Sequence, residues 1–112
     1  MKAGVYPWLR DNSAMGQADE QCRHVRAQGR VQGVGFRESC LRYARQHGIT
    51  GWVRNRSDGS VEAQLQGSPE ALDAMCKWLS HGVPGARVDG LEVLPSRGAF
   101  ERLDSFDRLP TL

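Results

Sequence analysis

An arginine and an asparagine, each at the end of a short motif, are the residues of this sequence best placed to do chemistry together. The motif GRVQGVGFR ends in Arg37, and GWVRN ends eighteen residues later in Asn55. The glycines of the first motif allow a turn to aim several backbone N–H groups at one point, where the positive end of a following helix adds to the field. A guanidinium beside that turn suits phosphate or carboxylate. Anion cradle, cation and neutral amide together favour hydrolysis of a phosphorylated substrate.

The residues around the first motif predict the elements that position it. Val25 and Ala27 alternate with polar residues, which indicates a half-buried strand leading into the glycine turn. Gly48 suits the left-handed position that ends a helix, and residues 49–55 predict a second strand. Apolar spacings of three and four after the turn predict a helix, with one face formed by Phe36, Cys40, Tyr43, Ala44 and His47.

The remaining segments continue the same kind of pattern. Residues 56–59, with an Asp-Gly pair, predict a hairpin connection, and residues 61–66 alternate as a third strand. The sequence at 68–70, Ser-Pro-Glu, is typical of a helix start, because serine caps, proline fits the first turn and glutamate favours the positive end. A fourth strand is predicted over 86–93, with a slip of alternation at Gly90 that indicates a bulge.

The order of these elements predicts an α+β fold of the ferredoxin-like βαββαβ type, a two-layer sandwich with two helices on one face of an antiparallel sheet. Beyond Pro95 the pattern is weak, and Phe100 and Phe106 are candidates for a last short strand. Residues 1–20 show no sustained period, so we expect an extension outside the fold, with the domain over 21–112.

Length and composition fit one small globular domain and exclude several classes. The chain has 112 residues with 39% hydrophobic and 25% charged residues and a net charge of +2, so no basic arm for nucleic acid is indicated. No membrane span or signal peptide is apparent, and a cytoplasmic protein is expected. The scattered cysteines and histidines lack the spacing of a disulfide framework or metal site; they are Cys22, Cys40, Cys76, His24, His47 and His81.

The two motifs in combination resemble those of the acylphosphatase family, over about Cys22 to Val93. The resemblance implies the βαββαβ fold and hydrolysis of the carboxyl–phosphate bond of acyl phosphates, without a metal or other cofactor. It places the two catalytic positions of the family on Arg37 and Asn55. The segment after Pro95 only loosely resembles the family's usual last strand, so its pairing stays open.

The chemistry of an acyl phosphate agrees with these assignments. The substrate is an activated anhydride with a carboxylate leaving group, so the main tasks are to hold the phosphoryl oxygens and to aim a water in line. Arg37 would supply paired charged donors, and Asn55 would orient the water without repelling the anion. Backbone N–H groups would surround the phosphate, from Gln32, Gly33, Val34, Gly35 and Phe36. We expect a monomer that acts on a small acyl phosphate, is inhibited by its product, inorganic phosphate, and binds neither nucleic acid nor membrane.

Two other interpretations compete with this one. An RNA-recognition module shares the order of elements, but it stacks bases on aromatic residues of the open sheet face. The outward positions of the third strand, Glu62, Gln64 and Gln66, offer no ring. An acylphosphatase-like domain could also serve binding, or a carbamoyl-phosphate step in a larger maturation protein, but no zinc motifs accompany this domain. Taken singly, a glycine turn, an arginine and an asparagine are most often structural.

Overall fold

The computed structural model describes residues 20–95 and 100–112. The expected extension over 1–20 therefore lies, apart from Glu20, outside the described residues. The elements of the described part follow the predicted order, with one strand added at the end: β1 (Gln21–Arg30), α1 (Phe36–Gln46), β2 (Thr50–Asn55), β3 (Val61–Gly67), α2 (Pro69–His81), β4 (Arg87–Pro95) and β5 (Phe106–Arg108).

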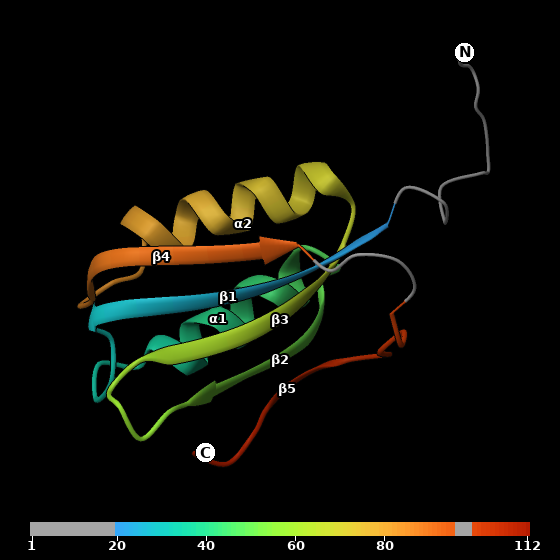
Figure 1. Cartoon of the computed structure of the whole chain (residues 1–112). Helices are drawn as coiled ribbons and strands as arrows, with labels where there is room; N and C mark the ends of the chain where they lie inside the picture. Colours follow the sequence, from blue (N-terminus) through green and yellow to red (C-terminus); the bar gives the residue numbers. More distant parts are fainter. Residues whose placement is uncertain (1–19, 96–99) are drawn as a thin grey trace.

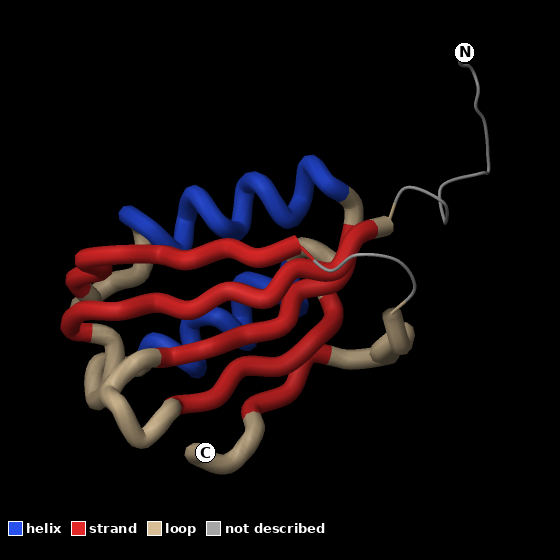
Figure 2. Tube along the Cα trace, viewed as in Figure 1, coloured by secondary structure: helices blue, strands red, loops and turns tan. Residues whose placement is uncertain are grey.

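The strands form a single sheet in the order β4-β1-β3-β2-β5, and both helices lie on the same side of it (Figure 1, Figure 2). Helix α1 packs over β2 and β5, whereas α2 packs over β4 and β1. This is the ferredoxin-like α+β sandwich that the sequence predicts. In the described residues, no helix is long and apolar enough to cross a membrane.

The prediction of an antiparallel sheet holds for β1 to β4, and β5 adds one parallel pair. Phe106 lies opposite Gly51 and Arg108 opposite Val53, with β5 running in the direction of β2. A parallel neighbour requires a long connection, and here β3, α2 and β4 all lie between β2 and β5 along the chain. The short strand is fastened by Gly51 N donating to Ser105 O at 2.9 Å and by Leu109 N donating to Val53 O at 2.9 Å.

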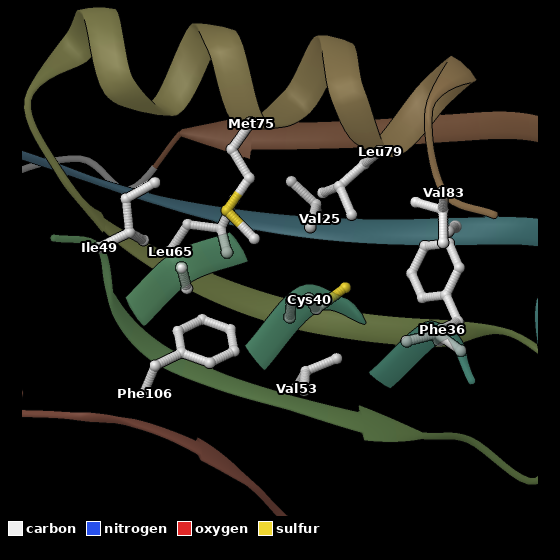
Figure 3. Packing of buried hydrophobic residues seen from close by; sticks show 14 of the residues in the cluster. Val25, Phe36, Cys40, Ile49, Val53, Leu65, Met75, Leu79, Val83 and Phe106 are labelled. Atoms are coloured by element: carbon white, nitrogen blue, oxygen red, sulfur yellow. The ribbon is translucent and has the colours of Figure 1, made fainter. Parts of the chain in front are cut away.

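The core lies between the sheet and the helices, where the alternating apolar positions of the strands meet the apolar faces of α1 and α2 (Figure 3). Phe106, the first residue of β5, is only 1% exposed and packs in the same cluster as Val53 and Cys40. Burial raises the pKa of the Cys40 thiol to about 12, so this cysteine is a neutral core residue. The last strand is thus part of the core and supports α1.

A bulge in β4 lies opposite the end of β1. Gln28 pairs with Gly90 and Gly29 with Val88, which leaves Asp89 as the extra residue. Gly29 has φ +125°, and a Cβ there would lie 2.3 Å from the Arg87 carbonyl oxygen, so this close approach requires glycine. The predicted slip at Gly90 is confirmed to within one residue. A bulge increases the local twist just where the chain leaves β1 for the glycine turn.

Candidate active site

The loop between β1 and α1 contains the first motif and turns on two glycines. Gly33 has φ +76° and Gly35, which caps the start of α1, has φ +79°. A Cβ at either position would meet no atom within 4 Å. Backbone conformation and not crowding therefore favours glycine at both positions, since the left-handed region costs other residues about 1–2 kcal/mol.

The start of α1 leaves several backbone donors free. Its first intrahelical bond runs from Ser39 N to Gly35 O at 3.0 Å, and no side chain caps the helix. The N–H groups of Phe36, Arg37 and Glu38 therefore have no helical acceptor. Within residues 20–95 and 100–112, the N–H groups of residues 32–35 donate to no hydrogen bond either. A run of unused donors thus surrounds the positive end of the helix.

The loop is held from both sides by the side chains of two predicted cradle residues. Gln32 Nε2 donates to the carbonyl oxygens of Arg56 at 2.8 Å and Ser60 at 2.9 Å, which ties the loop to the hairpin between β2 and β3. Val34 packs against the hydrophobic core. These contacts fix the backbone of the loop while its N–H groups stay unengaged.

A small cavity of about 90 Å³ opens where this loop, the first turn of α1 and the ends of β2 and β5 meet. The structure thereby brings together Arg37, Asn55 and three of the five predicted cradle residues. Gln32 and Val34 do not line the cavity. The lining residues are Val31, Gly33, Gly35, Phe36, Arg37, Glu38, Asn55 and Arg108.

In the part of the chain that the structure describes, two larger hollows lie elsewhere, and neither is lined by Arg37 or Asn55. One of about 440 Å³ is lined by residues that include Arg26 and Glu92, and one of about 280 Å³ includes Asp58 and Ser60. Their walls contain no residue of a helix start. We therefore select the candidate site by the chemistry of its lining and not by its volume.

Asn55 is the last residue of β2 and presents an unused acceptor. Its backbone is engaged, because it pairs with Val61 and its carbonyl oxygen accepts from Leu112 N at 3.1 Å. Its side-chain Oδ1 is buried and has no hydrogen-bond partner among the described residues. A buried acceptor without a donor costs about 1–3 kcal/mol, so such an atom in a folded protein calls for an explanation. A donor entering the cavity would satisfy it.

Two charged lining residues were missed by sequence reasoning. Glu38 follows Arg37 in the first turn of α1, and its carboxylate lies 3.4 Å from Arg108 and 3.8 Å from Arg42. Arg108 comes from β5, for which the sequence indicates only Phe100 and Phe106 as candidates. Phe106 begins the strand, and Phe100 lies outside it. The available signal was the strand period of two, because it places Arg108 on the same face as the buried Phe106.

The arginines on either side of Asn55 are occupied on the opposite face of the sheet. Glu62 is 3% exposed and accepts from Arg54 Nε at 2.8 Å and Arg56 Nη1 at 2.8 Å, with His24 Nε2 at 2.7 Å. Burial alone would raise the pKa of Glu62, but these hydrogen bonds and charges lower it to about 2. The carboxylate is therefore ionised at neutral pH and neutralises charge beside the site.

The open face of the sheet is more aromatic and less exposed than the third strand indicates. Glu62 and Gln66 are buried, and Trp52 of β2 lies on this face with the Arg54 guanidinium 4.9 Å from its ring centre. The indole N–H donates to Gln64 Oε1 at 3.1 Å. The alternation of the third strand gives no information about Trp52, which the neighbouring strand β2 contributes to this face. Its ring is already engaged by neighbours within the sheet.

Comparison with known proteins decides the family. The family model for acylphosphatase matches residues 23–107. The chain belongs to the acylphosphatase family. It is 59% identical over 90 residues to Acylphosphatase 1 of Ralstonia nicotianae, covering 80% of this chain and 88% of that protein. It is 60% identical over 88 residues to the acylphosphatase of Polaromonas naphthalenivorans, covering 79% and 87%. The chain is thus a hydrolase with acylphosphatase activity, as the sequence resemblance implies.

Solved structures support the same family through the fold. The acylphosphatase of Coxiella burnetii matches with a TM-score of 0.79 at 33% identity, over 86% of this chain and 99% of that one. The acylphosphatase of Bacillus subtilis matches with a TM-score of 0.75 at 34% identity, over 80% and 98%. The domain also resembles part of HypF from T. kodakarensis, with a TM-score of 0.66 at 32% identity, over 80% of this chain and 12% of that one.

Proposed function

We propose that the cavity between the glycine loop, α1, β2 and β5 is the active site, and that it hydrolyses the carboxyl–phosphate bond of acyl phosphates without a metal. One observation carries the proposal: the cavity that contains Arg37 and the unengaged N–H groups of the α1 start is also lined by Asn55, whose buried Oδ1 has no partner in the described part of the chain. A phosphoryl group and a water together use all three features.

The phosphoryl group would occupy the start of α1. Backbone N–H groups of residues 32–36 would donate to its oxygens, and the partial positive charge of the helix end would favour the anion. Arg37 would add two parallel charged donors, a geometry that matches phosphate. Because these donors are fixed by the loop before substrate arrives, they need little reorganisation as charge develops on the phosphoryl oxygens.

Asn55 would orient the attacking water. Its Oδ1 would accept a hydrogen bond from the water, which directs the oxygen lone pair toward phosphorus, in line with the leaving carboxylate. The leaving group is a weak base, so the reaction needs no strong general acid. A neutral amide also avoids repelling the anionic substrate. Charge stabilisation and positioning are then sufficient for phosphoryl transfer to water.

The proposal also covers the substrate, the domain bounds, the oligomeric state and the location of the protein. We propose that a small-molecule acyl phosphate is the substrate, that inorganic phosphate inhibits as product, and that residues 21–112 form the working domain with 1–20 outside it. We further propose a cytoplasmic monomer with no nucleic-acid or membrane partner. Light scattering of the purified protein across a hundredfold concentration range tests the monomer, which a concentration-dependent mass would contradict.

The direct test is hydrolysis of benzoyl phosphate in the presence of EDTA. The wild type should be active, and R37K should lose about 10²–10³ in kcat/KM, because an ammonium cannot reproduce the forked donors. R42K, on the solvent-exposed side of α1 and outside the cavity, is the matched control and should keep its rate. An R37K variant that retains most of the wild-type kcat would contradict the assignment of Arg37 to the phosphate-binding site. Phosphate binding without any hydrolysis would instead favour a binding domain.

Phosphate should also stabilise the folded protein. A ligand that binds only the native state adds about 2.7 kcal/mol of stability at a concentration one hundred times its Kd. We expect sodium phosphate to raise the Tm of the wild type in differential scanning calorimetry and to leave that of R37K nearly unchanged, with sodium sulfate and chloride at matched ionic strength as controls. EDTA should shift neither melting curve.

A further inference from the structure

Arg108 places a second guanidinium at the candidate site. It lines the cavity from β5, where the parallel register sets it opposite Val53, two residues before Asn55. The strand is anchored on both sides of it, because Arg45 Nη2 donates to Phe106 O at 3.1 Å and Leu109 N donates to Val53 O at 2.9 Å. The backbone of Arg108 therefore has a fixed position relative to the cavity.

The charge of Arg108 is only loosely engaged. Its Nη1 lies 3.4 Å from Glu38 Oε1, longer than the usual N–H···O range of about 2.7–3.2 Å, and both side chains are about half exposed. Exposed pairs of this kind contribute little to stability. By contrast, Arg54 bonds the buried Glu62 at 2.8 Å. Arg108 can therefore turn toward an anionic ligand at little cost.

The position of Arg108 fits the acyl part of the substrate better than the phosphoryl part. The free N–H groups lie on the loop and the first turn of α1, and the cavity of about 90 Å³ is far below the roughly 300–1,000 Å³ of sites that enclose a drug-sized ligand. An acyl group attached to a phosphoryl group in that cradle must extend out of the cavity. The sheet-edge wall of the opening is formed by β5, the outer strand, where Arg108 is 50% exposed.

We propose that Arg108 is a specificity-determining residue that binds a carboxylate carried by the acyl group, so that the preferred substrates are acyl phosphates of dicarboxylic acids. The forked guanidinium matches a planar carboxylate. Glu38 holds the side chain near the opening in the free protein, and the substrate carboxylate replaces it. This inference rests on the proposed function of the cavity.

The test compares substrates that differ only in the carboxylate. Wild type, R108Q and R108K are assayed with benzoyl phosphate and with 3- and 4-carboxybenzoyl phosphate, whose rigid rings keep the carboxylate away from its own acyl carbon. We expect R108Q to lose roughly tenfold more kcat/KM on at least one carboxybenzoyl phosphate than on benzoyl phosphate, mainly through KM, because the variant lacks the charged hydrogen bonds to the carboxylate. R108K should recover part of that preference.

The matched control is R42Q. Arg42, like Arg108, forms an ion pair with Glu38, but it does not line the cavity. R42Q should leave the ratio of the two substrates unchanged. Equal losses on all substrates, or a rise in the inhibition constant of inorganic phosphate in R108Q, would overturn the inference by assigning Arg108 to the phosphoryl group. No change in the ratio would overturn it as well. A wild-type protein that hydrolyses none of the three acyl phosphates would instead count against the proposed function.

Discussion

The two helices of this domain begin in opposite ways. Helix α2 starts with Ser68, whose Oγ accepts from Ala71 N at 3.2 Å, followed by Pro69, which has no N–H to satisfy, and Glu70. Helix α1 starts with Gly35 in the left-handed conformation. No side chain of the described residues caps it, and its first residues, whose N–H groups are unengaged, line a cavity. A good cap contributes about 1 kcal/mol, so the start of α1 gives up stability that α2 keeps.

The arginines show the same division. Arg54 and Arg56 hold the buried Glu62 with short ion pairs on the open face of the sheet. Arg37 lines the cavity on the helix side, and the neighbouring Glu38 is paired with Arg42 and Arg108 and not with it. Groups that hold the fold together find partners within it, whereas the Arg37 guanidinium and the Oδ1 of Asn55 have no partner in the described part of the chain.

Acid tests this division through the structural ion pairs of Glu62. The pKa of Glu62 is lowered to about 2 from its ordinary 4.5, so the stability it contributes is present above pH 4.5 and is lost as pH falls toward 2. We expect the free energy of unfolding to fall by up to about 3 kcal/mol over that window, measured by urea denaturation. An E62Q variant should be less stable at pH 7 and should show a flatter dependence. An equal acid slope in E62Q would contradict the assignment.

The N55A variant tests the residues of the cavity, in contrast to the structural ion pairs of Glu62. The variant should lower kcat by about 10², because the water loses its orienting acceptor, while the inhibition constant of inorganic phosphate stays nearly constant. Its Tm should not fall by the amount typical of a lost buried hydrogen bond, since Oδ1 makes none within the described residues. Weaker phosphate inhibition would mean that Asn55 holds the anion and not the water.

S68A should give the smallest effect and the reverse pattern. Removal of the cap of α2 should cost about 1 kcal/mol in the free energy of unfolding, because Ala71 N loses its acceptor. The kcat/KM for benzoyl phosphate should stay at the wild-type value, with S57A in the exposed hairpin as a control for both measurements. A loss of activity in S68A at a temperature well below its Tm would break the distinction between the two helix starts.

Sequence reasoning predicted the fold well where the pattern is local and repeated. The period of two in β1 and β3 and the spacings of three and four in α1 each follow from burial of one face, so the elements and their order could be derived. Strand β5 is only three residues long and pairs in parallel with β2 across a long connection. Three residues are too few to show a clear alternation of apolar and polar positions. The strand that β5 pairs with is set by tertiary packing around Phe106.

The candidate site was predicted to the extent that it lies in contiguous motifs. Arg37, Asn55, Gly33, Gly35 and Phe36 line one cavity. The motif does not reveal whether a residue acts through its backbone N–H or through its side chain. The hydrogen bonds from the Gln32 side chain to the hairpin could therefore not be predicted. Arg108 was missed for the same reason as β5. The burial of Asn55 Oδ1 is a result of tertiary packing, which no spacing along the chain reveals.

The most direct test of the site assignment is a titration of the full chain with inorganic phosphate. The backbone N–H groups are monitored in ¹H–¹⁵N correlation spectra at each phosphate concentration. We expect the largest shifts at the N–H groups of residues 32–37, saturating with one dissociation constant, and the N–H groups at the start of α2 should stay in place. Loss of those shifts in R37K would tie the guanidinium to the same pocket. Shifts centred on α2 or on the open sheet face, with residues 32–37 unmoved, would contradict the assignment of the site.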